Sequence, residues 1–386
     1  MVSDLRFLKN KLLIAWHASV SAYDQGRDGE LKMRKNANIV MLGTAPDALG
    51  GIASVIGIYY ASGIIDNCNI TYLVTHCTGT AQQKIFMLVK ACCTFTRLIL
   101  KRKIQIVHMH LACGMSFWRK ILFAAYATLL KIPFVIHLHS GNFPQYYSNS
   151  SKLTRLMIRC MFRLAAANIT VSRELKLWLE QISSIRPAVI IHNPICIPAI
   201  REASARKQST IVFLGRIEPT KGIIDLITAV QHISPSYPEA RLVIAGAGDT
   251  VTVKKIAADL GIASKIDFPG WVTGETKSAL LTTATLFVLP SYAEGMPMGV
   301  LEAMSHGTAV IASDVGGIPE AIHDGIEGLL VPPGNVLKLE EAITLLLCNR
   351  ELRERLGRAG QEAVRQRFST ASTSAALSDL YAKLLC

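Results

Sequence analysis

Short apolar runs recur along this chain, and each is followed by a turn-forming segment and then by a helix-like pattern. The first run covers residues 39–42, the turn residues are 43–51, and the helical pattern covers 52–62. The later apolar runs of the first half are 70–74, 104–109, 134–138 and 188–191. Strands that are apolar on both faces are typical of parallel sheets covered by helices on both sides. The pattern therefore predicts an α/β fold with a doubly wound parallel sheet.

The same alternation restarts in the second half, after a polar stretch at 201–210 that is typical of a linker. The apolar runs there are 211–214, 242–245, 265–268, 286–289 and 309–312. The chain has 386 residues and 50% of them are hydrophobic, so it can form two cores and is not disordered throughout. We expect two Rossmann-like domains facing each other across a cleft, with ligands at the carboxyl ends of the strands.

The expected organisation has four parts, which are a loose leader, two domains and a last helix. Residues 1–36 show little apolar periodicity and form the leader. The N-terminal domain covers 37–200, the C-terminal domain covers 201–366, and the last helix covers 367–386.

The positive charge of the chain belongs to its first half. Residues 1–200 contain 23 Lys and Arg against 8 Asp and Glu, whereas the second half contains 18 against 20, for a total of +13. A one-sided basic field attracts phosphates on nucleic acid, on anionic lipid or on a charged small substrate. The first half has no aromatic stacking motif and no known nucleic-acid module, so we expect no nucleic-acid partner.

The cysteines and the apolar stretches indicate a cytoplasmic protein. The nine cysteines form no CxxC pair and no Cys/His cluster at metal spacing, which is typical of a reduced compartment. The apolar run 12–18 is too short for a signal core, and Lys90 and Arg97 interrupt the most apolar later stretch. We therefore expect neither a secretory signal nor a membrane-spanning helix.

The segment 286–304 combines a buried strand, a loop and a helix that starts near Pro297. Free backbone N–H groups at such a helix start bind anionic phosphate. Glu294 lies in the loop and Glu302 lies about one turn inside the helix. Two carboxylates beside an anion site are suited to accept hydrogen bonds from sugar hydroxyls. The alternative is a Glu that favours the helix dipole and a second Glu on a solvated face.

Two cations follow the strand 211–214. Arg216 and Lys221 lie five residues apart around a turn, and together they can neutralise a diphosphate, although each can equally be a surface charge. In the first half, Gly50 and Gly51 sit between the first strand and its helix, where another group can approach the backbone. The segment 245–249 lacks the third glycine of a nicotinamide-binding fingerprint, so that cofactor is not expected.

Two pairs of histidines lie near the ends of consecutive strands. His137 and His139 share one face of the strand 134–138, and His108 and His110 repeat this arrangement one strand earlier. Four imidazoles can hold a metal, but no carboxylate is near them in the sequence, and such pairs are common without a metal. We therefore expect no metal there, and the alternative to a site role is a structural histidine.

Taken together, these segments resemble the retaining, nucleotide-sugar-dependent glycosyltransferases of family 4, also called glycosyl transferases group 1, of the bacterial polysaccharide-biosynthesis type. Glu294 and Glu302, separated by seven residues, carry the resemblance together with residues 215–222 upstream and 313–320 downstream. It covers residues 37–386 and is strongest from 211 to 330. The three segments are specific as a set, in order and each after a strand. The resemblance implies the GT-B fold, with the last helix crossing back to the first domain.

The resemblance also implies roles for single residues. Glu294 would bind the donor hexose and, with His139, would be catalytic; His137 is the reserve candidate for that histidine. Arg216 and Lys221 would hold the donor diphosphate. Glu302 would bind the ribose, and residues around Trp271 and Val272 would flank the base. The full donor-binding set is Gly51, Arg216, Lys221, Val272, Glu294, Gly295, Met298, Gly299, Val300 and Glu302.

The activity that the resemblance implies is transfer of a hexose from a UDP- or GDP-sugar to a glycan acceptor, with retained anomeric configuration. The cations and the helix N-terminus would stabilise the departing nucleoside diphosphate, and that phosphate would help to deprotonate the acceptor hydroxyl. Neither a metal nor another cofactor is expected. The alternatives are a nucleotide-sugar epimerase or glycan phosphorylase of similar architecture, or a non-enzymatic polyanion-binding protein.

The first half also predicts contact with an anionic membrane surface. Residues 83–103 are basic at both ends and apolar between, as in an amphipathic helix that lies on a bilayer, and 118–123 and 152–163 add basic and apolar residues. The alternative is an ordinary helix covering the sheet. We expect a peripheral protein at the inner face of the cell membrane, with a polyprenyl-diphosphate-linked saccharide of exopolysaccharide or lipopolysaccharide biosynthesis as its acceptor.

Overall fold

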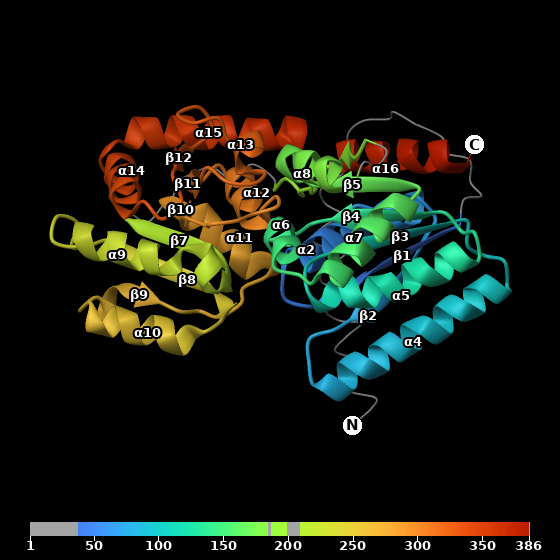
Figure 1. Ribbon diagram of the computed structural model, residues 1–386. Helices are drawn as coiled ribbons and strands as arrows, with labels where there is room; N and C mark the ends of the chain where they lie inside the picture. The colour runs from blue at the N-terminus through green and yellow to red at the C-terminus, as the bar shows by residue number, and fades with distance from the viewer. Residues whose placement is uncertain (1–37, 184–186, 199–208, 386) are drawn as a thin grey trace, which may run out of the picture.

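The structure is a computed structural model that describes residues 38–183, 187–198 and 209–385. It contains two α/β units side by side (Figure 1). The expected leader, residues 1–36, and the expected domain boundary at 200–201 lie outside the described residues. Within the described part of the chain, no helix combines the length and the apolar character needed to cross a bilayer.

The N-terminal unit is built on a six-stranded parallel sheet in the order β2-β1-β3-β4-β5-β6. Its strands are β1 (Ile39–Thr44), β2 (Ile70–His76), β3 (Ile106–Leu111), β4 (Phe134–Leu138), β5 (Ala167–Thr170) and β6 (Val189–Ile190). The sequence pattern missed β5 because polar residues interrupt it. One of them, Asn168, is buried, and its side-chain amide donates to the Phe162 carbonyl at 3.0 Å.

Helices cover both faces of this sheet (Figure 1). They are α2 (Gly51–Ala61), α3 (Ile64–Asn67), α4 (Ala81–Leu100), α5 (Met115–Leu129), α6 (Phe143–Ser148), α7 (Lys152–Leu164) and α8 (Arg173–Ser183). Helices α4 and α5 pack against each other through Phe95, whose ring centroid lies 5.3 Å from that of Phe123. On the opposite face, Tyr59 of α2 contacts the ring of His110 on β3.

The C-terminal unit has a second six-stranded parallel sheet, in the order β12-β11-β10-β7-β8-β9. Its strands are β7 (Thr210–Ile217), β8 (Arg241–Gly248), β9 (Ile266–Asp267), β10 (Leu286–Leu289), β11 (Ala309–Ser313) and β12 (Leu329–Val331). The sequence pattern missed β12, which has three residues at the sheet edge, two of them only half-buried. Leu329, Leu330 and Val331 are all apolar, but a run of three residues is too short to indicate a strand in the sequence.

The helical segments of this unit complete the doubly wound arrangement. They are η1 (Pro219–Lys221), α9 (Ile223–Ile233), α10 (Thr250–Asp259), η2 (Ala263–Lys265), α11 (Gly274–Thr283), α12 (Met298–Ser305), α13 (Ile318–Ala321), α14 (Val336–Cys348) and α15 (Arg350–Arg367). The sheets and helices confirm the predicted α/β architecture of two doubly wound units.

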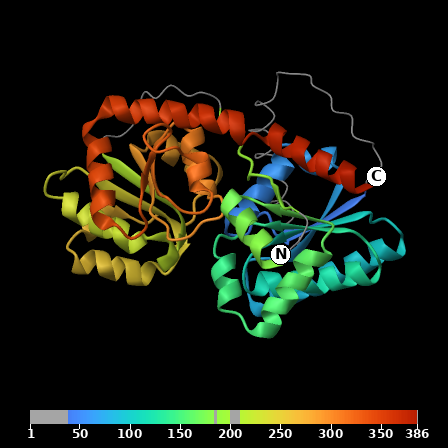
Figure 2. The same cartoon turned by 45° about the horizontal axis from the view of Figure 1, so that its top comes forward.

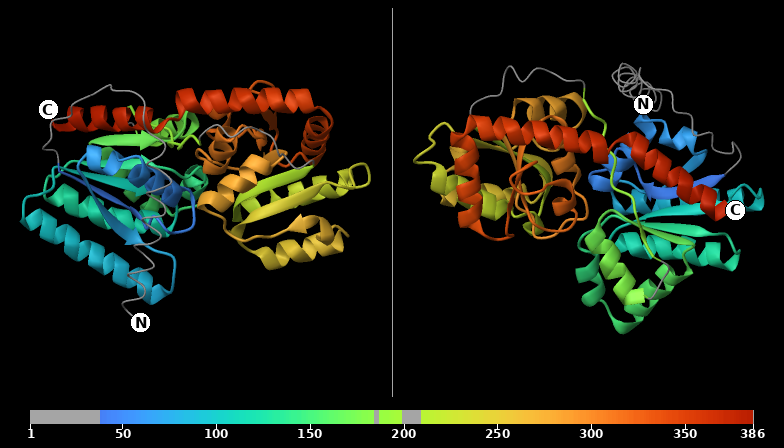
Figure 3. Two further views of the ribbon diagram at one scale, coloured as in Figure 1. Left: turned by 180° about the vertical axis from the view of Figure 1, so that it is seen from behind. Right: turned by 90° about the horizontal axis from the view of Figure 1, so that it is seen from above.

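The last helix, α16 (Thr370–Leu385), lies over the N-terminal sheet, while α15 covers the C-terminal unit (Figures 1 and 2). Tyr381 of α16 is buried, and its hydroxyl lies 2.7 Å from His108 Nδ1 on β3. The two connections between the units run side by side, because Ile195 N donates to the Phe368 carbonyl at 2.8 Å and Ile195 bridges to Ser369. The view from behind and the view from above show the same crossing (Figure 3).

Candidate active site

The carboxyl ends of the two sheets meet at one place, which we call the domain junction. The loop after β4 (residues 139–141) contacts the loop after β10 (residues 294–295), and a Cβ atom at Gly141 or Gly295 would overlap the opposing backbone. Asn193 Nδ2 also donates to the Met296 carbonyl at 2.9 Å across this junction. Ligands of parallel α/β sheets bind at the carboxyl ends of the strands, so this junction is the candidate active site.

Glu294 lies at the junction in a nearly closed environment. It is 8% exposed, and its Oε1 accepts from Lys221 Nζ at 2.7 Å and from Ser291 Oγ at 2.7 Å. Lys221 follows β7, the neighbour of β10 in the sheet, which explains how residues 73 positions apart meet. The structure therefore brings together two of the residues singled out from the sequence, one acidic and one basic.

Glu302 has its own cationic partner, which the sequence analysis missed. Lys277 Nζ on α11 lies 2.6 Å from Glu302 Oε1 on α12. Both side chains are mostly buried, with 24% and 12% of their surfaces exposed. No motif marks Lys277, because the segment around it reads as an ordinary polar helix. The contact arises only where α11 and α12 come together.

Arg216 is placed differently from Lys221. It stands near the carboxyl end of β7 with 61% of its side chain exposed, and its Nε lies 3.5 Å from Glu218 Oε2. Its guanidinium is therefore held weakly and is open to solvent. An exposed Arg at a strand end can turn toward an arriving anion, so its diphosphate role stays a prediction.

The start of α12 provides backbone donors next to Glu294. Pro297 is the N-cap residue and no side chain caps the helix. The amides of the first turn, which include Met298, Gly299 and Val300, therefore have no side-chain acceptor. Gly51, at the start of α2, lies opposite, because a Cβ there would be 3.9 Å from Met298 Cγ. The four residues form a place where backbone from both units can approach one ligand.

Val272 lies in the loop between β9 and α11 and packs, half-buried, against the hydrophobic core. This loop leads directly into the helix that carries Lys277. The role of Val272 beside a nucleotide base stays a prediction.

His139 follows β4 at the junction and belongs to a cluster of four imidazoles. Its Nε2 lies 2.7 Å from His110 Nδ1, and its ring is stacked on that of His137 with centroids 4.1 Å apart. His108 Nε2 lies 3.3 Å from His137 Nδ1. The parallel register explains the cluster, because His110 of β3 pairs directly with His137 of β4.

The four histidines are electrically neutral near pH 7. Burial lowers the pKa of His108 to about 3, and burial also lowers the pKa of His139 to about 3 against the opposing effect of a hydrogen bond with Asn193. Burial, reinforced by the other imidazoles, holds the pKa of His110 and His137 well below the usual range. A neutral His139 can donate or accept a hydrogen bond, but it offers no positive charge to a substrate.

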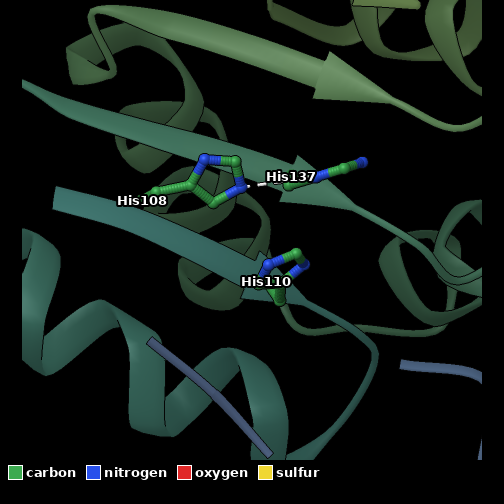
Figure 4. Close-up of side chains that lie close together, drawn as sticks. All are labelled: His108, His110 and His137. Carbon is green, nitrogen blue, oxygen red and sulfur yellow. Dashed lines mark hydrogen bonds between the residues drawn. The ribbon is translucent and has the colours of Figure 1, made fainter. Parts of the chain in front are cut away.

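Three of these imidazoles lie close enough to be considered as metal ligands (Figure 4). One nitrogen each of His108, His110 and His137 falls within 4.8 Å of the others. However, the facing nitrogens of His108 and His137 already share a hydrogen bond, and Tyr381 engages the other nitrogen of His108. Nε2 of His110 and Nε2 of His137 are buried and have no hydrogen-bond partner among the described residues, so the expectation that the cluster holds no metal stays a prediction.

Models of two glycosyltransferase families match this chain, one in each half. Residues 198–363 match the family model described as glycosyl transferases group 1. Residues 73–197 match the model described as Glycosyltransferase Family 4.

Curated relatives point the same way. A phosphatidyl-myo-inositol mannosyltransferase from Mycobacterium leprae is 30% identical over 261 residues, which are 60% of this chain and 69% of that protein. The match to an alpha-maltose-1-phosphate synthase from Mycobacterium tuberculosis is 37% identical over 187 residues, but it spans only 45% of this chain and 47% of that protein.

Solved structures share the fold. A sucrose-phosphate synthase from Thermosynechococcus elongatus superimposes with a TM-score of 0.76 at 19% identity, covering 90% of this chain and 99% of that one. The Anabaena protein HepE, solved in complex with UDP-glucose, gives a TM-score of 0.71 at 18% identity, covering 89% of this chain and 99% of that one. Both units and their arrangement are therefore found together in other proteins.

Proposed function

Since this chain belongs to the family 4 glycosyltransferases and has their GT-B fold, we propose that it transfers a hexose from a nucleoside-diphosphate sugar, UDP- or GDP-linked, to a glycan acceptor with retained configuration. One observation carries this proposal. The ion pairs Lys221–Glu294 and Lys277–Glu302 lie at the carboxyl end of the second sheet, beside the uncapped start of α12. Cations, carboxylates and free amides together match a ligand with both a diphosphate and hydroxyl groups.

When the donor binds, its phosphate and hydroxyl groups would replace the contact that Lys221 and Glu294 make with each other. In the structure Lys221 and Glu294 neutralise each other at 2.7 Å. A bound donor offers phosphate oxygens to Lys221, Arg216 and the α12 amides, and hydroxyls to Glu294. Each group then keeps a polar partner when the site closes around the donor. The cations and amides stabilise the negative charge that develops on the leaving nucleoside diphosphate.

His139 would act on the sugar as a neutral hydrogen-bonding group. Its low pKa removes it as a cation or as a general acid near pH 7. The mannosyltransferase relative and the UDP-glucose complex of HepE favour a hexose donor without choosing the sugar or the base. No metal takes part in this proposal, so chelation with EDTA should leave the transfer rate unchanged.

The acceptor would be presented by a membrane. Helix α4 exposes Phe86, Val89 and Leu100, which are 68%, 54% and 79% accessible, among basic residues such as Lys84 and Lys90. Helices α5 and α7 expose further apolar side chains, namely Met115, Leu122, Leu153 and Leu156. Apolar side chains mixed with lysine and arginine fit an anionic bilayer, which supports a lipid-linked saccharide acceptor at the inner membrane face. The pathway would then be exopolysaccharide or lipopolysaccharide synthesis.

A two-part experiment tests the donor and the reaction. UDP- and GDP-sugars are screened by thermal shift, because a ligand that binds only the folded protein raises the melting temperature. The sugar that stabilises best is then incubated with membrane extract, and free nucleoside diphosphate is measured. We expect its release only when extract supplies an acceptor. An epimerase would convert the sugar without acceptor, and a non-enzymatic polyanion binder would release nothing.

A further inference from the structure

A second basic site lies in the N-terminal unit, on the β2 and β1 side of the sheet and away from the donor residues. It consists of His76, Lys84, Arg119 and Lys120, which we call the cation cluster. His76 ends β2, Lys84 lies in the first turn of α4, and the other two stand on α5. Near pH 7 the positive charge at the carboxyl end of β2 comes from α4 and α5, because the low pKa of His76 keeps its imidazole neutral.

Lys120 occupies a position where helix α5 should be apolar. The buried residues of that helix are Phe117, Lys120, Phe123, Ala124 and Ala127, spaced as one core-facing stripe. Lys120 is 2% exposed, and its Nζ donates to Thr75 Oγ1 at 2.5 Å. Thr75 in turn donates to the Gly43 carbonyl of β1 at 2.8 Å. Within residues 38–183, 187–198 and 209–385, Lys120 has this hydroxyl as a partner but no carboxylate as the counter-ion that burial of an ammonium demands.

Arg119 also has an unsatisfied side-chain nitrogen. Its Nε is buried and has no hydrogen-bond acceptor among the residues that the structure describes. Burial lowers the pKa of Arg119, and burial followed by the Arg119 charge lowers the pKa of Lys120 to about 7. Burial and then the charges of Arg119, Lys84 and Lys120 lower the pKa of His76 to about 4. Burial is the largest cause of each pKa shift, and for Lys120 and His76 the neighbouring positive charges act in the same direction.

No carboxylate offsets this charge within the described ranges. The acidic residues of the described N-terminal unit are Asp47, Asp66, Glu174 and Glu180, and none forms an ion pair with the cluster. A group of cations that folding brings together without an acid is stabilised when an anion binds.

The position of the cluster suits an acceptor. It lies at the same carboxyl edge as His139, but β2 and β4 are three strand spacings apart, about 15 Å. We propose that the cation cluster binds the phosphate or diphosphate group of the acceptor, which rests on the transferase function proposed above. The distance between β2 and β4 leaves room for the saccharide part of the acceptor, which would lie between its bound phosphate and the reacting sugar at the domain junction.

Inorganic diphosphate is the first probe, titrated into the full chain by calorimetry. The donor cations would bind diphosphate too, so the protein used in these titrations also carries the substitutions Arg216→Gln and Lys221→Gln. We expect one remaining class of diphosphate binding, weakened about tenfold or more by Arg119→Gln. Lys131→Gln, just beyond the C-terminal end of α5, removes the same charge and should change nothing. Unchanged binding in the Arg119 variant overturns the proposal.

Lys120→Met separates a ligand role from a structural one. If Lys120 serves the anion, the variant loses diphosphate binding while its melting temperature stays equal or rises, because a desolvated ammonium has been removed. If Lys120 only ties α5 to β2, the variant keeps diphosphate binding and melts lower. The second result contradicts the proposal.

Further arms distinguish the source of the phosphate. Farnesyl diphosphate should bind with the same dependence on Arg119 as the inorganic salt. If Arg119→Gln weakens binding to phosphatidylglycerol vesicles but not to either diphosphate, the cluster serves the membrane surface and the proposal is wrong. The thermal shift with nucleotide sugars reports on the donor site when the Arg119→Gln variant shows the same shift as the wild type. Its failure in the wild type would refute the proposed transferase, whereas diphosphate binding tests the cluster independently.

Discussion

Lys221 Nζ and Glu294 Oε1 lie 2.7 Å apart, although 73 residues separate them in the chain. The pair joins the loop after β7 to the loop after β10, which are neighbouring strands. Because both groups are largely buried, neither can lose its partner without a replacement. A donor that carries negative phosphate at one end and hydroxyls at the other supplies both replacements.

Replacing Glu294 by Ala should remove most turnover while the fold stays intact. The substitution removes the hydroxyl acceptor and leaves Lys221 without its partner, so we expect kcat to fall about 100-fold or more. The measurement is nucleoside diphosphate release at saturating donor, with circular dichroism as a check of folding. Glu341→Ala, which removes an exposed carboxylate paired with Lys338, serves as control. Near wild-type turnover in the Glu294 variant would show that its assignment is wrong.

His139→Ala should likewise remove most turnover, and the pH profile identifies how His139 acts. Since burial lowers its pKa to about 3, the imidazole stays neutral from pH 5 to pH 8 and contributes no inflection there. The profile of kcat is measured for the wild type and for His139→Asn, which can still form hydrogen bonds. An inflection near pH 6.5 that disappears in the variant would contradict a neutral His139.

The imidazole cluster should make the fold sensitive to acid. An unfolded histidine has a pKa of about 6.5, whereas folding lowers that of His108 to about 3. Between these values the unfolded chain binds more protons, so the free energy of unfolding is complete above pH 6.5 and decreases as the pH falls toward 3. Each such imidazole lowers the free energy of unfolding by up to about 1.4 kcal/mol for each unit by which the pH falls in this range.

Urea unfolding at pH 7.5 and pH 5 measures this loss. His108→Asn should lose less stability between the two pH values than the wild type does. His232→Asn changes an imidazole outside the cluster that is 43% exposed, and it serves as the control. An equal loss in the wild type and in the His108 variant would mean that the cluster does not titrate on unfolding.

Lys277→Met should weaken donor binding more than it slows the reaction. Lys277 holds Glu302 at 2.6 Å, and without it the carboxylate loses its fixed orientation toward the proposed ribose hydroxyls. We expect KM for the donor to rise about tenfold, with a smaller change in kcat. Lys255→Met, on an exposed part of α10, is the matched control. A loss confined to kcat would argue against a ribose-side role.

Membrane binding can be tested by cosedimentation with anionic and neutral liposomes. Phe86→Ser should reduce binding to anionic liposomes several-fold, because a side chain that is 68% exposed would enter the bilayer interface. Leu337→Ser, with the same exposure but on the C-terminal unit, should have no effect. Equal, negligible binding of the wild type to both liposome types would contradict the proposed contact with an anionic membrane.

Much of the fold and part of the site follow from local pattern. The predicted boundaries of β4 and β10 are those observed, because a buried strand between helices needs an unbroken apolar run. Val189 and Ile190 form a shorter strand than predicted, and β5 was missed where Asn168 is buried with its side-chain N–H group satisfied by the Phe162 carbonyl. The sequence pattern cannot predict such a hydrogen bond, because the carbonyl that accepts it belongs to another part of the backbone.

By itself, the amino-acid sequence determined which segments form most of the strands, and so it placed Lys221, Glu294 and His139 after strands. Arg216 lies inside β7, because that strand continues to Ile217 and does not end at residue 214 as predicted. Strand and loop preferences act between neighbouring residues, so they can be read along the chain. Only the tertiary structure decided that Lys277 holds Glu302, that four imidazoles cluster, and that Lys120 is buried with no acidic partner in the described part of the chain. Those relationships depend on the packing of distant elements, which sets the distances between their side chains and the water that they exclude.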